Sequence, residues 1–272
     1  MDENTSVKGI GNVKIAKSDV VFETPKFISD INNCIFYHTM ELPGYGVIDG
    51  TCFDLRGREE DYLGNISVDG KRVLDVGTAS GFNCFYLEKK GAEVIALDLS
   101  PKQDWDIIPY PGKNIQIERQ NRNKRTTGLN NAFWLAHRLN NSKAKLIHGT
   151  IYEDFLHKIG PVDVSIICSI LLHTRDPFRA LTNILSFTKE TAVITEINYN
   201  NLNDMGPILS FAPSLKKNQH QDVWWRFTPD ILQTFLGMAG FKITSVKEYS
   251  INNSKSIAVN FFTITADRAV PL

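Results

Sequence analysis

The sequence predicts an α/β fold built around a mostly parallel β-sheet, and three observations support this prediction. From residue 71 onward, short apolar runs alternate with helix-like patterns, as in parallel sheets that carry helices on both faces. Residues 73–81 read as a buried strand that breaks into a glycine loop. A second apolar run, residues 94–97, ends in a carboxylate, Asp98.

Seven strands are expected, and the order of elements along the chain predicts how the sheet ends. We place the strands near residues 71–76, 93–98, 145–149, 162–168, 191–196, 241–250 and 257–266. No helix-like pattern separates the last two, so they should form a C-terminal antiparallel hairpin.

Two helix starts can be read from local chemistry. Asp176 precedes Pro177 and Thr228 precedes Pro229, which places a capping side chain before a proline at the first helical position. Gly240 is expected to end the second of these helices. A further helix is expected at about residues 127–139, after a basic run.

Two segments lie outside the seven expected strands and the helices that connect them. Residues 1–70 form an N-terminal extension ahead of the domain at 71–272, and residues 198–226 form an insertion before the last helix. Ligands of open α/β sheets bind at the carboxyl ends of the strands. Both additions are therefore expected to contribute to ligand recognition there.

Composition restricts the class of protein. The 272 residues include 30 basic and 30 acidic side chains, whereas nucleic-acid-binding proteins usually show a basic excess, so a polynucleotide partner is disfavoured. The four cysteines show no spacing typical of a metal or redox site, and we expect no metal. The sequence shows no signal peptide and no apolar run long enough to span a membrane, so a cytoplasmic protein without membrane contact is expected.

The glycine loop and Asp98 suit an adenosine-containing cofactor. Gly77 and Gly81 allow backbone torsions and close approach that a Cβ would prevent. The two oxygens of Asp98 can accept hydrogen bonds from both ribose hydroxyls. The spacing departs from the Gly-x-Gly-x-x-Gly of dinucleotide sites. The alternative is an ordinary strand-to-helix turn.

This loop resembles motif I of class I S-adenosylmethionine methyltransferases. Further segments are similar to a subgroup of that family related to the tRNA wobble-uridine carboxymethyltransferases, which also includes enzymes acting on small metabolites. They are residues 37–42, 53–56, 71–77, 104–106, 133–139, 171–177 and 223–229. The resemblance implies a Rossmann-like seven-stranded methyltransferase sheet, S-adenosylmethionine as cofactor and S-adenosylhomocysteine as product.

The resemblance also implies a set of cofactor-binding residues. Asp75, Gly77, Thr78, Ala79 and Gly81 would hold the methionine part, with Asp98 and the adjacent Leu99 at the ribose. Trp105 and residues Thr150, Ile151 and Tyr152 would line the adenine, and Cys168 and Ser169 would lie near the sulfonium.

One departure from the subgroup bears on the reaction. The tRNA enzymes carry Tyr-His where this chain has Leu172-His173, and that tyrosine helps them to bind a carboxylated cofactor. Its absence favours plain methyl transfer.

His38 and His173 are the candidate catalytic residues. A sulfonium is already activated, so alignment of the acceptor is the main requirement, and a base is needed only when the acceptor must lose a proton. His173 follows the fourth predicted strand, and His38 lies in the N-terminal extension. The alternative for each is a structural role in anchoring a loop.

Candidate acceptor-binding residues lie mostly in the two additions. Tyr37, Glu41, Phe211, Trp224 and Trp225 could bind or enclose an acceptor. The alternatives are core packing for the tryptophans and Phe211, and a solvated surface position for Glu41.

A basic run precedes the helix expected at about residues 127–139. Arg122 belongs to it, with Arg119, Lys124 and Arg125. The run is either a solvated loop or a mobile lid over an anionic acceptor.

Three functions follow from these observations. The leading one is methyl transfer to a small organic acceptor in specialised metabolism. The alternatives are a tRNA uridine-modifying enzyme and a non-catalytic binding module that keeps the fold.

Overall fold

The computed structural model describes residues 22–154, 156–216 and 220–271. The predicted N-terminal extension is therefore described from residue 22, and its first 21 residues lie outside the described part.

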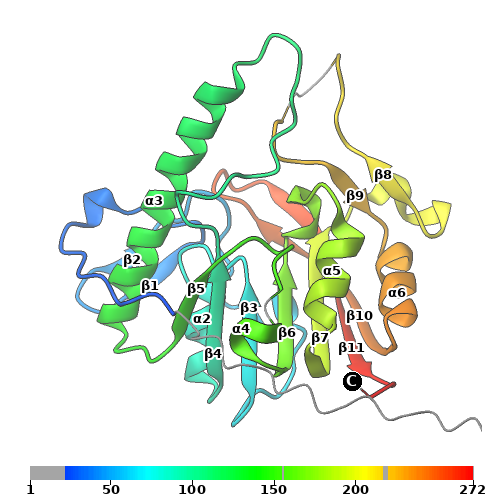
Figure 1. Ribbon diagram of the computed structural model, residues 1–272, viewed down its shortest axis with the longest axis horizontal. Coiled ribbons are helices and arrows are strands. Elements are labelled where there is room, and N and C mark those ends of the chain that lie inside the picture. Colours follow the sequence, from blue (N-terminus) through cyan, green and yellow to red (C-terminus); the bar gives the residue numbers. More distant parts are fainter. Residues whose placement is uncertain (1–21, 155, 217–219, 272) are drawn as a thin grey trace, which may run out of the picture.

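A seven-stranded sheet forms the centre of the molecule (Figure 1). Its order is β10, β11, β7, β6, β3, β4, β5. The strands are β3 (Arg72–Val76), β4 (Glu93–Asp98), β5 (Lys145–His148), β6 (Val162–Cys168), β7 (Thr188–Ile197), β10 (Phe241–Asn252) and β11 (Ala258–Arg268). The predicted strands are confirmed with small shifts at their ends.

Strand direction confirms the predicted hairpin. Strands β3 to β7 are parallel, while β11 pairs antiparallel with both β7 and β10. After β3 the chain builds outward through β4 and β5, then returns to place β6 on the other side of β3. Open α/β sheets bind ligands at such a switch point, here at the carboxyl ends of β3 and β6.

Helices cover both faces of the sheet. One face carries α2 (Phe82–Lys89), α3 (Ile115–Leu139) and the N-terminal segment, and its core includes the fully buried Phe133 and Trp134. The other face carries α4 (Leu156–Ile159), α5 (Pro177–Leu185) and α6 (Pro229–Met238). Asp176 and Thr228 cap α5 and α6 as predicted, accepting from the N–H groups of Arg179 and Ile231.

The predicted start of α3 is wrong. The helix begins at Ile115, so the basic run lies on its first turns and forms no loop. The Asn114 side chain caps it by accepting from the N–H groups of Gln116 and Ile117. Arg122 then pairs with Glu118 one turn earlier, an arrangement that stabilises a helix.

The additions form small elements of their own. The N-terminal segment contains β1 (Met40–Leu42), β2 (Gly46–Ile48), α1 (Glu59–Tyr62) and a 3-10 turn at Ile31–Asn33. The insertion contains a 3-10 turn at Asn200–Met205 and a ribbon of β8 (Leu209–Phe211) and β9 (Trp225–Phe227). A third 3-10 turn, Leu171–His173, follows β6.

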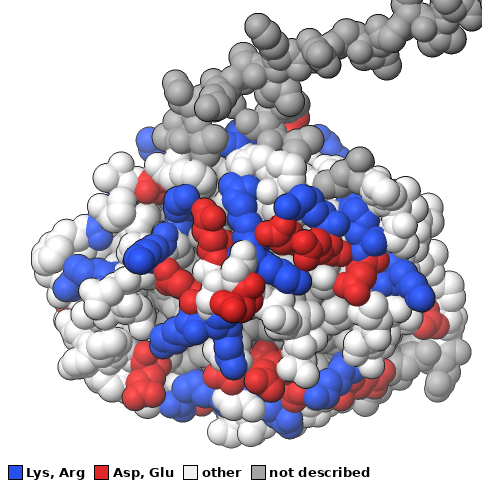
Figure 2. All heavy atoms as spheres, turned by 90° about the horizontal axis from the view of Figure 1, so that it is seen from below, with Lys and Arg blue, Asp and Glu red and all other residues white. Residues whose placement is uncertain are grey.

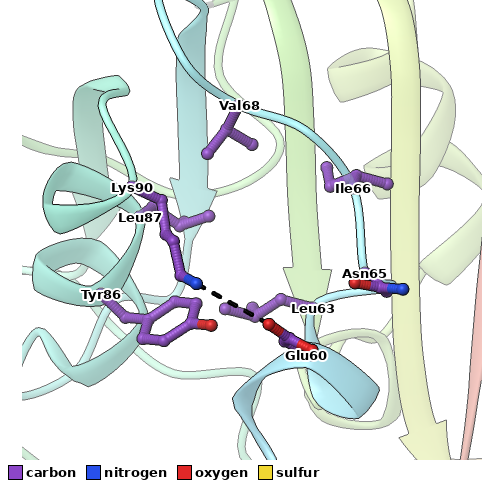
Figure 3. Close-up of a pocket in the computed structure, with 8 residues that line it drawn as sticks. All are labelled: Glu60, Leu63, Asn65, Ile66, Val68, Tyr86, Leu87 and Lys90. Atoms are coloured by element: carbon purple, nitrogen blue, oxygen red, sulfur yellow. Dashed lines mark ion pairs between the residues drawn. The ribbon is translucent and has the colours of Figure 1, made fainter.

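The N-terminal segment packs onto the core. Leu42, Leu55 and Tyr62 are buried in the same apolar cluster as the sheet. Between α1 and α2 a hollow of about 60 Å³ remains, where Glu60 and Lys90 approach to 3.7 Å (Figure 3). This volume is far below the range of small-molecule sites.

The face at the amino ends of the parallel strands shows interspersed positive and negative charges (Figure 2). Lys71 pairs with Glu190 at 3.2 Å, and Lys145 pairs with Glu93 at 3.0 Å. This face shows no large patch of positive charge of the kind that binds a phosphate backbone.

We predict that the β1–β2 hairpin unfolds together with the sheet. Leu42→Ala removes a side chain that is 1% exposed and should lower the free energy of unfolding by about 2–5 kcal/mol. Val47→Ala, at a position 49% exposed in the same hairpin, should change it by less than about 0.5 kcal/mol. Urea unfolding followed by circular dichroism measures both. Equal midpoints for the two variants would contradict the prediction.

Candidate functional site

A cavity of about 190 Å³ opens at the switch point, where its lining residues come from the carboxyl ends of β3 and β4 and from the loops after β5 and β6. Most of the predicted cofactor residues meet there. Those that line it are Gly77, Asp98, Leu99, Trp105, Thr150, Ile151 and Tyr152, together with His173. The structure adds residues that the sequence did not single out, namely Val76, Leu97, Asp104, Asp106, Gly149, Ile170 and Thr174.

The glycine loop has the predicted freedom and close packing. Gly77 has φ +75°, and a Cβ there would lie 2.0 Å from Cδ1 of Ile170. Gly81 has φ +89°, and a Cβ there would lie 2.4 Å from the Phe85 ring. Both positions therefore require glycine for conformation and for space.

Asp98 fastens this loop to the tip of β4. Its Oδ2 accepts from the N–H of Ala79 at 2.6 Å, and its Oδ1 accepts from the N–H of Leu99 at 2.7 Å. Burial raises the pKa of Asp98, and these two N–H groups oppose that rise. Each oxygen has a second lone pair, so the carboxylate can still accept two hydrogen bonds from the cavity.

Asp75 lies beneath the same loop. Within the described part of the chain, neither carboxylate oxygen has a hydrogen-bond partner, although Thr78 and Asn83 lie beside it. Burial raises the pKa of Asp75 to about 7, while Thr78 and Asn83 oppose the rise and the charge of Asp98 adds to it. Asp75 is 1% exposed and does not itself line the cavity, so it lies directly behind the glycine loop.

The wall after β5 is held by hydrogen bonds to Asp106. The Tyr152 hydroxyl donates to the Asp106 carboxylate at 2.6 Å, and the N–H of Arg175 donates to it at 2.7 Å. Burial, followed by this bond, raises the pKa of Tyr152 to about 12, so the hydroxyl stays protonated at neutral pH.

Arg122 closes the wall on the α3 side. Its guanidinium lies 5.0 Å from the Trp105 ring and pairs with Asp222 of the insertion at 2.8 Å, besides Glu118 at 2.7 Å. The side chains of Arg122 and Asp222 are only 15% and 26% exposed. The positive charge of Arg122 is thus already compensated by two carboxylates, which leaves little of it for an anionic acceptor.

His173 joins this wall. Its Nδ1 donates to the backbone oxygen of Asp222 at 2.5 Å, which leaves Nε2 without the proton when the ring is neutral. Burial lowers the pKa of His173, and the ring meets Trp105 at 6.2 Å. A structural role in holding the insertion therefore accounts for the contacts of His173.

His38 lies in an aromatic cluster of the N-terminal segment. It packs against Tyr37, Phe82 and Tyr62 at ring-centroid distances of 4.8, 5.5 and 6.3 Å. Burial lowers the pKa of His38 to about 3, so the ring is neutral at pH 7. Among described residues neither ring nitrogen has a hydrogen-bond partner.

This cluster reaches the end of β6. The Tyr62 hydroxyl is 3.1 Å from the Ser169 hydroxyl, and the Cys168 thiol donates to the backbone oxygen of Tyr62 at 3.6 Å. Burial raises the pKa of the Cys168 thiol, so it is a thiol and not a thiolate at neutral pH. Ser169 has φ +53°, which turns the chain sharply out of the strand.

The other predicted acceptor residues lie around the insertion or on the surface. The Trp224 indole donates to the backbone oxygen of Asp106 at 2.6 Å, and the Trp225 indole donates to that of Arg175 at 3.2 Å. Phe211 is exposed and meets Trp225 at 5.4 Å. Glu41 is exposed on β1. None of these four lines the cavity.

Glu196 is a buried acid that the sequence did not single out. It lies on β7, accepts from the N–H of Leu171 at 2.8 Å and also faces the N–H groups of Ile170 and Leu172. Burial raises the pKa of Glu196 to about 8. A glutamate inside an apolar strand, residues 192–197, is the signal that could have found it.

Two negative findings apply to the described ranges alone. They contain no group of three or more His, Cys, Asp or Glu side chains able to hold a metal ion. They also contain no helix long and apolar enough to cross a membrane.

Comparison with known proteins identifies the fold. No protein-family model and no curated protein sequence matches the chain. Among solved structures, the chain is similar to the 1,6-didemethyltoxoflavin N1-methyltransferase of Burkholderia thailandensis, with TM-score 0.52, 16% identity and coverage of 79% of this chain and 78% of that one. It is also similar to the magnesium protoporphyrin IX methyltransferase of Synechocystis PCC 6803, with TM-score 0.50, 14% identity and coverage of 79% and 81%. The chain therefore has the fold of class I methyltransferases.

We predict a pH-dependent effect of Glu196→Gln. With a pKa raised to about 8, folded Glu196 keeps a proton that the unfolded chain loses above its ordinary pKa of about 4.3. The unfolded state then binds fewer protons, so this residue lowers the free energy of unfolding as pH rises from about 4.3 to about 8. The stability of Glu196→Gln relative to the parent should rise over that window, by at most about 1.36 kcal/mol per pH unit.

Urea unfolding at pH 5, 6, 7 and 8 measures this difference. Glu190→Gln, at an exposed position of the same strand, is the control and should show a much smaller slope. A difference between Glu196→Gln and the parent that stays constant from pH 5 to 8 would contradict the assignment of a protonated buried acid.

Proposed function

We propose that this protein is an S-adenosylmethionine-dependent methyltransferase acting on a small organic acceptor. The observation that carries the proposal is Asp98. It stands at the tip of β4 on the edge of the cavity, fixed by two backbone N–H groups and left with one lone pair on each oxygen. This is the arrangement that two neighbouring ribose hydroxyls require.

The remaining walls fit the other parts of the cofactor. Trp105, Ile151 and Tyr152 offer flat and apolar surfaces for adenine. The unpartnered Asp75 and the glycine at position 77 suit the charged methionine end, because one supplies an acceptor and the other permits close approach. The bound cofactor would supply a methyl group on an activated sulfonium, and Cys168 and Ser169 are the residues that we place near it.

Catalysis in this proposal depends mainly on alignment. Residues of the N-terminal extension and the insertion would hold the acceptor, and the neutral His38 could take a proton or a hydrogen bond from it. Its pKa of about 3 makes it a weak base in the closed aromatic cluster. We therefore give His38 the catalytic role only for acceptors whose binding opens that cluster, and His173 a positioning role.

Plain methyl transfer is favoured over carboxymethyl transfer. Leu172, where the tRNA-modifying subgroup has tyrosine, is buried in the apolar cluster beneath α5 and α6 and offers no hydroxyl. The resemblance to that subgroup stays a prediction from the sequence. Specialised metabolism is likewise proposed as the setting.

Asp98→Ala should abolish tight cofactor binding. Removing two charge-assisted hydrogen bonds costs about 3 kcal/mol or more, so the Kd for S-adenosylhomocysteine should rise about 100-fold or more. Calorimetric titration measures it, with Asp49→Ala, an exposed carboxylate on the N-terminal segment, as the control. Equal affinity of Asp98→Ala and the parent would refute the ribose assignment.

The same titration distinguishes the cofactors. S-adenosylmethionine and S-adenosylhomocysteine should bind the parent protein, and carboxy-S-adenosylmethionine should compete poorly. Clear preference for the carboxylated cofactor would instead support the tRNA alternative. If none of the three compounds binds, the non-catalytic binding module is the remaining alternative.

A further inference from the structure

A second cavity, of about 290 Å³, lies beside the first, under the insertion. It is lined by Tyr110, Tyr199, Ala212, His220, Val223 and Arg226. Tyr199 follows the end of β7 by two residues, so this cavity also lies at the carboxyl edge of the sheet.

One chain segment, residues 221–224, forms the wall between the two cavities. Val223 lines the second cavity. Its neighbour Asp222 accepts from His173, and its neighbour Trp224 donates to Asp106, while His173 and Asp106 both line the first cavity. The two spaces are therefore adjacent.

Arg226 is the distinctive residue of the second cavity. Its guanidinium carbon lies 5.2 Å from the centre of the Tyr199 ring, and its Nε is buried without a hydrogen-bond partner. No carboxylate in the described ranges forms an ion pair with it, in contrast to Arg122, which has two such partners.

A partly buried cation without a counter-charge is costly unless an anion joins it. The planar guanidinium can donate two parallel hydrogen bonds to a carboxylate or a phosphate. The Tyr199 and Tyr110 rings supply flat walls, and the Tyr110 hydroxyl is already oriented by the N–H of Ser214 at 3.1 Å. Arg226 also interacts with the Tyr199 hydroxyl. The cavity thus combines a cation that has no ion-pair partner among the described residues with space for a small planar molecule.

We propose that this cavity is the acceptor subsite and that Arg226 binds an anionic group, a carboxylate or a phosphate, of the methyl acceptor. The inference deepens the proposed methyltransferase function and rests on it. Arg226 acts here as a specificity residue, because it selects acceptors that carry a negative charge.

The test compares two probes of nearly the same size and shape, one anionic and one neutral. 4-Fluorobenzoate and neutral 4-fluorobenzamide are titrated into the full-length protein by fluorine NMR, with and without saturating S-adenosylhomocysteine. The benzoate should bind the parent at least about ten-fold more tightly than the amide. Arg226→Gln should lose this preference, and Arg226→Lys should keep only part of it, because lysine keeps the charge without the planar fork.

Lys242→Gln is the matched control, since it removes one positive charge from an exposed position at the start of β10. It should bind both probes as the parent does. Competition with inorganic phosphate shows whether the site binds carboxylates alone or phosphates as well. Displacement of the benzoate would mean that phosphate binds at the same site.

Equal binding of benzoate and benzamide to the parent, an unchanged preference in Arg226→Gln, or no binding of either anion would overturn the proposal. Titrating the parent protein with and without S-adenosylhomocysteine distinguishes failure of the anion-site proposal from failure of the methyltransferase proposal. Failure to bind S-adenosylhomocysteine defeats the methyltransferase function, whereas charge-selective binding of the probe in its absence still establishes the anion site.

Discussion

The site depends on hydrogen bonds that fasten each loop of the switch point to the neighbouring strand. Asp98 of β4 accepts from Ala79 in the loop after β3, and Glu196 of β7 accepts from Leu171 in the loop after β6. In both cases a carboxyl group crosses to the adjacent strand's loop. Ala79 has φ +50°, a conformation that costs about 1–2 kcal/mol, and a charge-assisted hydrogen bond of about 1.5–3 kcal/mol offsets it.

Asp98 and Glu196 differ in how much hydrogen-bond acceptor capacity remains on their carboxyl groups. Asp98 borders the cavity and retains acceptor capacity, whereas Glu196 is 1% exposed and faces several backbone N–H groups. The same kind of contact therefore leaves a carboxylate with free acceptor capacity at the cavity edge on one side of the switch point, and an enclosed carboxyl group on the other.

The sequence predicted the sheet well because its central strands are buried on both faces and read as continuous apolar runs. Gly77 and Asp98 of the first cavity were predicted from the strand ends, whereas Trp105 and residues 150–152 were predicted only from the family resemblance. The prediction failed at the start of α3, where residues 115–125 are mainly polar and show no apolar stripe. The contact of Arg122 with Asp222 joins residues 100 positions apart, and no local pattern encodes such a contact.

The insertion contributes to the surroundings of both cavities. It supplies Asp222, which neutralises Arg122 of α3, and Trp224, which bonds to the backbone of Asp106. Two residues further on it supplies Arg226, which has no acidic partner in the described ranges. One short segment thus compensates a charge at the first cavity and leaves one uncompensated at the second. Substitutions within it can change the charge and the lining of the second cavity while the loops fastened by Asp98 and Glu196 keep their shape.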